Sequence, residues 1–240
     1  MIPLRDDNPA HITPLITVTF IVLCTLVYLY QASLPPQPGE LFVYRFGAIP
    51  ATVFGHAALP PEIHGASPFI ALITSMFLHG SWMHLIGNML YLWIFGNNIE
   101  DVMGHTRFIM FYVACGILAV FSHAVTDPSS TVPMVGASGA ISGVLGAYLL
   151  LFPHAQVLVL IPLGIYTRMI YVPAALVLGL WFIMQVLSGG MSVGRSGGGV
   201  AFFAHVGGFL AGMALIGLFK RPEVKFFSPQ RHRTWDDSRW

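Results

Sequence analysis

The sequence has very little charge. Only 9% of its 240 residues are Asp, Glu, Lys or Arg, whereas 55% are hydrophobic, and the mean hydropathy is +0.73. An ordinary soluble domain carries about 25% charged residues. So few charged side chains cannot cover the surface of a soluble globule of this size. The composition therefore argues against a water-soluble enzyme, a nucleic-acid-binding protein and a disordered chain, and it predicts an integral membrane protein.

Cysteine is also scarce. Cys24 and Cys115 both lie in apolar stretches, where they are expected to pack, and their number and spacing fit neither a disulfide framework nor a metal site. His79 and His84 lack the HExxH spacing and have no thiolate nearby. We therefore predict no metal and no cofactor. Asp6 and Asp7 in the opening segment, with no small-residue cleavage site after the apolar run, argue against a signal or transit peptide.

Long apolar runs are the main feature of the sequence. A transmembrane helix needs about 20 mostly apolar residues, and Ser81 is a good N-cap for one of them. The expected fold is an all-α bundle of six transmembrane helices, at about residues 14–31, 82–96, 108–125, 137–152, 169–187 and 200–219. Three segments are expected: an N-terminal segment, the six-helix domain and a basic tail, at residues 1–13, 14–219 and 220–240.

The connections differ in character. Residues 32–80 begin SLPPQPGE, which cannot remain helical, and their aromatic interior predicts a long structured first loop embedded in the membrane interface. NNIEDVMGHTR and TDPSSTVP are expected as short loops, VLVLIPLGIY is too short to span a membrane, and SGGMSVGRSGGG is expected as a flexible loop.

The positions of the basic residues predict the orientation. Six spans place both ends of the chain on one side. With the termini inside, nine of the 11 Lys and Arg residues lie on the inner side, and Arg45 and Arg195 lie outside. This bias follows the positive-inside rule. We therefore expect a multi-pass protein of the cell (inner) membrane with both termini cytoplasmic.

Polar residues recur at one depth in three of the predicted helices. His84 and Asn88 are four residues apart on one face of the second helix, with His79 just above them. The fourth helix begins near Ser138, and His205 lies about a turn and a half into the sixth. Since all three helices enter from the outer side, these groups are expected to lie near one another, and polar groups inside a membrane are functional candidates.

Small residues allow the fourth and sixth helices to approach closely. They include Gly136, Gly139, Gly208 and Gly212. If these faces meet, Ser138 comes within reach of an imidazole that can serve as its general base.

The remaining groups of an acyl-transfer site are also at hand. His84, Asn88 and the Ser138 amide are suitable donors for a developing oxyanion. A triad would need a carboxylate, but no Asp or Glu falls inside a predicted span. We therefore predict a Ser–His dyad that opens toward the outer face.

Each of these residues also has an ordinary structural explanation. Ser138 alone could serve helix packing, and His205 alone could be a proton relay or a core histidine. Other polar residues are assigned structural or solvated positions: Ser142 as packing, His123 as structural, Gln185 as an interhelical hydrogen bond, and His56 and His64 as solvated loop residues.

Taken together, the motifs resemble those of the rhomboid family of intramembrane serine proteases. The matching stretches are HGSWMHLIGN at residues 79–88, GASGA at 136–140 and AHVGGFLAG at 204–212. The resemblance implies a rhomboid-type six-helix bundle that cleaves a peptide bond within or near the transmembrane segment of membrane-protein substrates, through an acyl-enzyme. It also implies Ser138 as nucleophile, His205 as base, His84, Asn88 and the Ser138 amide as oxyanion hole, and His79 beside a water cavity.

Two other classes of protein remain open at this point. One is a catalytically silent relative that binds or escorts membrane proteins, against which both Ser138 and His205 argue. The other is a small transporter that uses His84, Asn88 and His205 as a proton path, although the sequence shows no internal repeat. The expected partners are transmembrane protein substrates and membrane lipids, with no nucleic acid.

Overall fold

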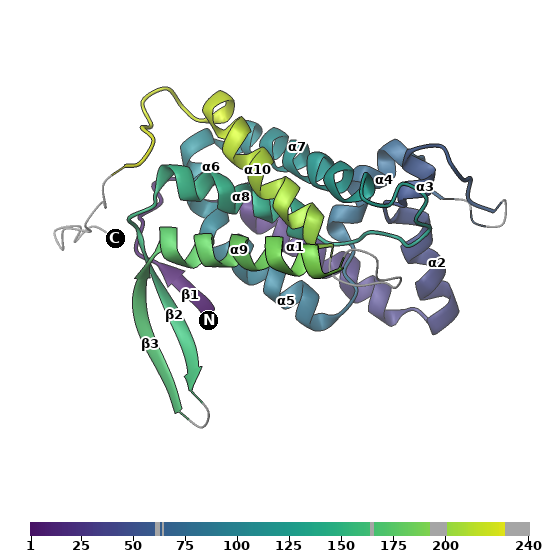
Figure 1. Ribbon diagram of the computed structural model, residues 1–240, viewed down its shortest axis with the longest axis horizontal. Helices are drawn as coiled ribbons and strands as arrows, with labels where there is room; N and C mark the ends of the chain where they lie inside the picture. Colours follow the sequence, from purple (N-terminus) through teal and green to yellow (C-terminus); the bar gives the residue numbers. More distant parts are fainter. Residues whose placement is uncertain (61–62, 64, 164–165, 193–200, 229–240) are drawn as a thin grey trace.

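A computed structural model describes residues 1–60, 63, 65–163, 166–192 and 201–228. Most of its helices lie side by side along the long direction of the molecule (Figure 1). The helices of this part of the chain are α1 Leu15–Ser33, α2 Pro36–Phe46, α3 Pro50–Val53, α4 Pro68–Thr74, α5 Trp82–Tyr91, α6 Asn97–Met103, α7 His105–Ala124, α8 Ser138–Leu151, α9 Ala174–Ser192 and α10 Phe202–Phe219, with a 3₁₀ turn η1 Ser75–Phe77 and a π-helical turn η2 Leu92–Gly96.

Four of the described helices are long and apolar enough to cross a membrane. They are α1, α7, most of α9, and α10. A fifth span is possible if Pro68–Phe77 and Trp82–Met103, which meet at 84°, cross together. The protein is therefore a membrane-embedded, multi-pass chain. The predicted count of six is not reached by this criterion, because α8 has 14 residues and is about 21 Å long.

Helix α8 lies at the centre of the bundle. Eleven of its residues are buried, from Gly139 to Tyr148 and again at Leu151. A helix that is apolar and buried on all sides needs neighbours all round, and α7, α9, α10 and η2 supply them. Because the helix is surrounded by protein, its first residue is held in a defined position.

The predicted first loop is largely helical. Helices α2, α3 and α4 and the turn η1 occupy much of residues 34–80, and Ser67 caps α4 by accepting the N–H of Ile70. The N-cap prediction for the next helix is confirmed, because the Ser81 hydroxyl accepts the N–H of His84 at 3.1 Å and α5 begins at Trp82. The prolines of this segment break it into short helices, since each lacks a backbone N–H.

The expected polar loop after the second span is wrong. Asn97–Met103 is helical, and the helix ends at Gly104, whose φ is +77°. Glu100 is fully buried there, and its carboxylate accepts hydrogen bonds from the backbone N–H groups of Ile16 and Thr17 and from the Thr17 hydroxyl, at 2.7–2.8 Å. The Glu100 carboxylate therefore binds the first turn of α1, where backbone N–H groups have no helical acceptor.

A three-stranded antiparallel sheet, which the sequence analysis did not predict, replaces part of the expected fifth helix. Its order is β1 Ile2–Asp6, β2 Gln156–Leu163 and β3 Tyr166–Pro173. Residues 169–173 therefore belong to β3, and α9 begins at Ala174 rather than Met169. The fold is thus not purely α-helical.

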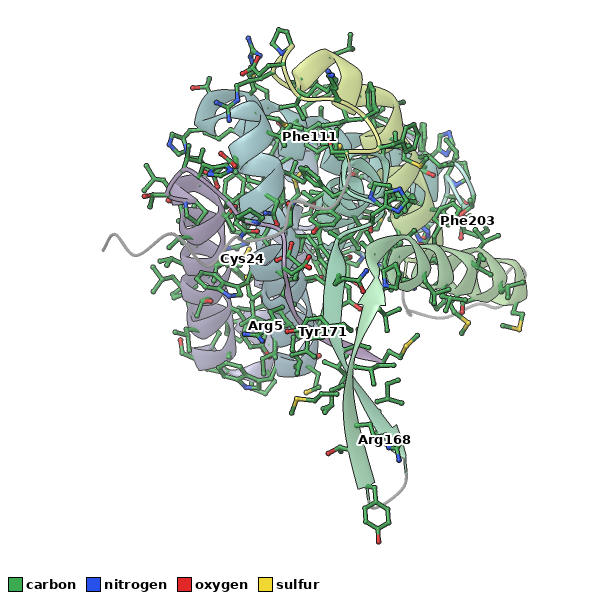
Figure 2. All side chains as sticks on the ribbon, turned by 90° about the vertical axis from the view of Figure 1, so that its left-hand side faces the viewer. Arg5, Cys24, Phe111, Arg168, Tyr171 and Phe203 are labelled. Carbon is green, nitrogen blue, oxygen red and sulfur yellow. The ribbon has the colours of Figure 1, made fainter. Side chains whose placement is uncertain are left out.

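The β2–β3 hairpin leaves one end of the bundle and runs across the helix axes (Figure 1). Figure 2 shows Arg168 toward its far end, whereas Arg5 and Tyr171 lie beside each other near the bundle, where their side chains hydrogen-bond at 2.8 Å.

The other predicted helix bounds fall close to the observed ones, as for α7, α8 and α10. Residues 188–192 of the predicted glycine-rich loop continue α9. The rest of that loop, and the tail from residue 229, lie outside the described residues.

Candidate active site

Ser138 is the first residue of α8, and its position depends on the turn before it. Gly136 has a φ of +124°, a conformation that favours glycine. Its N–H donates to the carbonyl of Ser75 at 2.9 Å, and an added Cβ would lie 2.7 Å from the His84 ring. The positive φ and the contact with His84 each require glycine at this position. The turn that Gly136 forms sets the direction in which the chain enters α8 at Ser138.

His205 lies in the first turn of α10, against the start of α8. Its Nε2 is 2.8 Å from the Ser138 Oγ, within hydrogen-bond distance. Both side chains are half-buried. The structure thus brings together a hydroxyl and an imidazole from two separate helices, the arrangement that activates a serine nucleophile.

Glycines allow these two helices to touch backbone to backbone. A Cβ added at Gly208 would overlap the carbonyl oxygen of Gly139, and one added at Gly212 would overlap that of Gly143. A Cβ at Gly139 would lie 2.6 Å from the Cβ of Ala119 on α7. The close approach that places Ser138 beside His205 therefore excludes any larger side chain at these positions.

The hydrogen bonding of His84 determines which of its ring nitrogens carries hydrogen. Its Nδ1 accepts the N–H of Gly80 at 3.3 Å. A neutral imidazole has one donor and one acceptor nitrogen, so the hydrogen is on Nε2. That nitrogen lies on the side of the ring that faces Gly136, two residues before Ser138.

Asn88 presents a further donor to the region around Gly136. It is the seventh residue of α5 and is 8% exposed. Its Nδ2 has no hydrogen-bond partner within the described part of the chain, and it would lie 3.7 Å from a Cβ at Gly136. A buried amide donor without a partner is uncommon in folded proteins, and this one is directed at the turn that precedes Ser138.

His79 lies at the edge of this group. It is fully buried, and its ring centroid is 5.2 Å from that of His84. Neither of its ring nitrogens has a hydrogen-bond partner in the part of the chain that the structure describes. The motif resemblance implied a water cavity beside this residue. A cavity of about 30 Å³ lies nearby, lined by Ser138, Gly136 and Ser75, but His79 does not line it.

The amino ends of three helices converge here. His84, Ser138 and His205 occupy the first turns of α5, α8 and α10. The first backbone N–H groups of a helix have no helical acceptor, and they carry partial positive charge. The Ser138 amide is such a group in α8. The region where these three helix amino ends meet therefore favours a negatively charged oxygen.

Helix α9 contributes two residues to the surroundings of His205. Gln185 was predicted to form an interhelical hydrogen bond, and this is confirmed: its Oε1 is 2.8 Å from the Nδ1 of His205. The Trp181 ring lies beside the same imidazole, with centroids 5.9 Å apart and an angle of 35° between the planes. A glutamine in an otherwise apolar helix already indicates an interhelical hydrogen bond. That its partner is His205 depends on how the helices pack.

The other polar residues considered in the sequence have different surroundings. Ser142 donates to the carbonyl of Ser138 at 2.6 Å, and His56 is exposed. His123 has a buried Nδ1 without a partner among the described residues, and His64 lies outside them. Within the described residues, no three His, Cys, Asp or Glu side chains form a group that could hold a metal ion.

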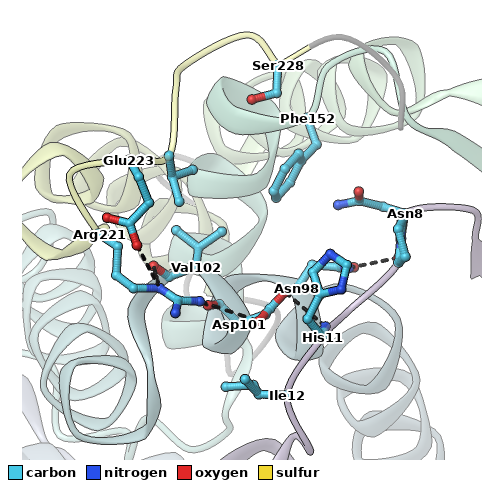
Figure 3. A pocket seen from close by; sticks show the side chains of 12 residues that line it. Asn8, His11, Ile12, Asn98, Asp101, Val102, Phe152, Arg221, Glu223 and Ser228 are labelled. Atoms are coloured by element: carbon cyan, nitrogen blue, oxygen red, sulfur yellow. Dashed lines mark hydrogen bonds and ion pairs between the residues drawn. The ribbon is translucent and has the colours of Figure 1, made fainter. Parts of the chain in front are cut away.

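A larger cavity, of about 270 Å³, lies at the other end of α8, where Phe152 lines it (Figure 3). Arg221 forms ion pairs there with Asp101 at 3.5 Å and Glu223 at 3.8 Å, and it donates to the Asp101 and Val102 carbonyls. These contacts join the chain after α10 to the end of α6. The cavity is separated from Ser138 by the length of α8.

The apolar spans and the site motifs together define a class of membrane protein, and comparison with known proteins identifies its family. The rhomboid domain family matches residues 66–222. The chain belongs to the rhomboid family.

Several curated proteins are similar to this chain. Rhomboid protein 1, mitochondrial, of Saccharomyces cerevisiae is 31% identical over 150 residues, 60% of this chain and 40% of that protein. RHOMBOID-like protein 5 of Arabidopsis thaliana is 33% identical over 160 residues, 66% and 47% of the two chains. Rhomboid protease GluP of Bacillus subtilis is 42% identical over 78 residues, 32% and 15%. The matched part spans less than half of each of these relatives.

Proposed function

We propose that this chain is an intramembrane serine endopeptidase that hydrolyses a peptide bond within or near the transmembrane segment of membrane-protein substrates. The observation that carries the proposal is the 2.8 Å separation of Ser138 Oγ and His205 Nε2 beneath three converging helix amino ends. Two of the matched proteins of Bacillus subtilis, GluP and YdcA, carry the words rhomboid protease in their names, which supports a proteolytic activity.

In the proposed first step, the Ser138 Oγ attacks the carbonyl carbon of the scissile peptide bond while the His205 Nε2 takes the hydroxyl proton. The carbonyl oxygen becomes an oxyanion. The Nε2–H of His84, the Nδ2–H of Asn88 and the Ser138 amide are the proposed donors to it. Removal of one donor of this kind typically costs about 100- to 1,000-fold in rate.

In the second step, the C–N bond breaks, and His205 returns its proton to the leaving amine. This leaves an acyl ester on Ser138. A water molecule then gives a proton to His205 and attacks the ester carbon, and Ser138 leaves with its proton restored. The dyad uses no carboxylate, and burying a charged one in an apolar surrounding would carry a large desolvation cost.

The proposal extends to the topology. The rhomboid domain would comprise residues 14–219, with α8 as a short sixth span, residues 1–13 and 220–240 in the cytoplasm, and Ser138 near the outer face of a cell membrane. The substrates would be transmembrane proteins, reached through the surrounding lipid. Nine of 11 basic residues on the termini side support this orientation.

The test compares the purified chain with its Ser138→Ala variant on several single-pass membrane substrates in one detergent or lipid preparation. We expect cleavage by the wild-type protein, loss of cleavage in the variant, and labelling by a fluorophosphonate that disappears with Ser138. Equal cleavage by both proteins, or cleavage by neither of them, would overturn the proposal and favour a relative that binds membrane proteins without cutting them.

A further inference from the structure

Helix α9 provides the Nδ1 side of the His205 imidazole with a hydrogen-bond acceptor. The Gln185 Oε1 lies 2.8 Å from Nδ1, while the Nε2 of the same ring lies 2.8 Å from Ser138 Oγ. The imidazole is therefore held at both nitrogens, by residues from two different helices. Gln185 is half-buried, so this hydrogen bond is partly screened from its surroundings.

The chemical nature of the acceptor determines the tautomer of the His205 ring. An amide oxygen can only accept a hydrogen bond, so the Nδ1 of His205 must carry the ring hydrogen. The lone pair of the neutral ring is then on Nε2, where it faces the Ser138 hydroxyl. This is the tautomer that a general base requires, and a histidine without such a partner divides its population between two tautomers.

Helix α9 is held against α10 just beside this bond. The rings of Phe182 and Phe209 stack with centroids 4.6 Å apart, and the Trp181 ring centroid is 6.1 Å from that of Phe209 and 5.9 Å from that of His205. The opposite face of α9 is apolar and exposed, as at Ile183, Met184 and Leu187. The orientation of the imidazole thus depends on where α9 lies.

We propose that Gln185 is a positioning residue for the Ser138–His205 pair: its side-chain oxygen selects the Nδ1–H tautomer of His205 and makes the competent geometry depend on the packing of α9. This inference rests on the proposed function, because it assigns Gln185 a role in that reaction. Gln185 itself touches neither the substrate nor the reacting atoms in the proposed steps.

Two substitutions at this position separate positioning from packing. Gln185→Met keeps the length and volume of the side chain but removes the oxygen. Gln185→Glu keeps an acceptor oxygen and removes the amide donors. A packing role would tolerate methionine and reject a charged residue, whereas an acceptor role has the opposite order. Met184→Leu, next in sequence but on the exposed face, is the matched control.

The expected result is a fall in kcat of about 10- to 100-fold for Gln185→Met, with KM within about twofold of the wild-type value, because the base is misoriented in the bound complex. Gln185→Glu should stay within about threefold of the wild-type kcat, and Met184→Leu should be unchanged. Thermal midpoints in the same detergent check that each variant is folded, and Gln185→Leu replaces the methionine variant if that one does not assemble.

A wild-type kcat in Gln185→Met would overturn the inference, and so would a loss in Gln185→Glu as large as that in Gln185→Met. Ser138→Ala, assayed in the same series, separates this failure from a failure of the proposed function. If Ser138→Ala cleaves as well as the wild-type protein, the proposed protease is wrong. If only Ser138→Ala is inactive, the protease stands and Gln185 has no positioning role.

Discussion

The direction of individual hydrogen bonds decides what each polar side chain of the site can do. The Nδ1 of His84 accepts from a backbone N–H, so its Nε2 is a donor, whereas the Nδ1 of His205 faces an amide oxygen, so its Nε2 is an acceptor. The two histidines therefore have opposite roles beside Ser138: the Nε2 of His84 donates, whereas the Nε2 of His205 accepts. Spacing in the sequence does not reveal this difference, because it depends on what lies behind each ring.

The first prediction concerns Asn88. Replacing Asn88 with Ala should lower kcat by about 100-fold, since one oxyanion donor is lost, and should leave the thermal midpoint nearly unchanged, because Nδ2 has no hydrogen-bond partner among the described residues. Steady-state cleavage and thermal unfolding measure the two quantities. Asn97→Ala, at the start of α6, serves as the control and should retain the wild-type rate. An unchanged kcat in Asn88→Ala would remove this residue from the proposed oxyanion site.

A second prediction at this scale concerns pH and Asp6, in strand β1. Burial raises the pKa of Asp6 to about 7, although the Tyr148 hydroxyl donates to its carboxylate at 2.5 Å. The folded state therefore binds a proton more tightly than the unfolded state, and the stability that this proton supplies is lost as the pH rises from about 4 through 7. A shift of about three units corresponds to at most about 4 kcal/mol.

Asp6→Asn removes this titration and keeps an oxygen for the tyrosine. The thermal midpoint of Asp6→Asn minus that of the wild-type protein should therefore grow between pH 5 and pH 8. The exposed Val132→Ala variant, which alters no titratable group, should show a constant difference over the same range. A constant difference for Asp6→Asn as well would contradict the raised pKa.

At the scale of helices, the contact between α8 and α10 determines whether the dyad forms. Each helix carries its site residue in its first turn, and the glycines further along bring the two backbones together. Because α8 is buried on nearly all sides, neither helix can shift without disturbing its other neighbours. The separation of Ser138 and His205 is therefore a property of this helix pair.

The third prediction tests this contact. An alanine at Gly212 would overlap the Gly143 carbonyl oxygen, so Gly212→Ala should lower the free energy of unfolding by about 1–3 kcal/mol. It should also slow fluorophosphonate labelling of Ser138, because the helices move apart. Gly179→Ala in α9 is the matched control, since a Cβ there meets nothing within 4 Å. That variant should be neutral or more stable by up to about 1 kcal/mol, through helix propensity. Equal stabilities of the two variants would argue against backbone contact.

At the scale of the whole molecule, contacts between distant segments close the bundle at the end away from Ser138. Glu100 binds the first turn of α1, Arg221 binds the end of α6, and β1 pairs with β2 across about 150 residues of sequence. These contacts join the beginning and the end of the described chain to the helices between them. They fix where these helix ends lie relative to one another.

The fourth prediction concerns Glu100. Glu100→Gln retains one acceptor oxygen where the carboxylate has two, and it loses the charge that strengthens each hydrogen bond. The free energy of unfolding should fall by about 2–3 kcal/mol, measured by thermal or denaturant unfolding in detergent. Glu223→Gln, whose side chain is 68% exposed in a long ion pair, should change it by less than about 1 kcal/mol. If both variants had the same stability, the Glu100 contacts would not secure α1.

Several features follow from the sequence alone because their causes are local. Apolar length and the residues that interrupt it predicted α1, α7, α8 and α10 to within a few residues, and Ser81 capped α5 as expected. The apolar residues of a span are consecutive in sequence, so a long apolar run is sufficient evidence for a span. The motifs around His84, Ser138 and His205 were also sufficient to suggest the family, to which the chain belongs.

Other features depend on partners that are distant in sequence. The charged stretch around Glu100 looks like a loop until Thr17 supplies its hydrogen bonds, and residues 169–173 look helical until they pair with β2. Gln185 became informative only when its neighbour proved to be His205. Polarity and periodicity describe what a side chain is able to bind, whereas the packing of separate helices decides which group it meets.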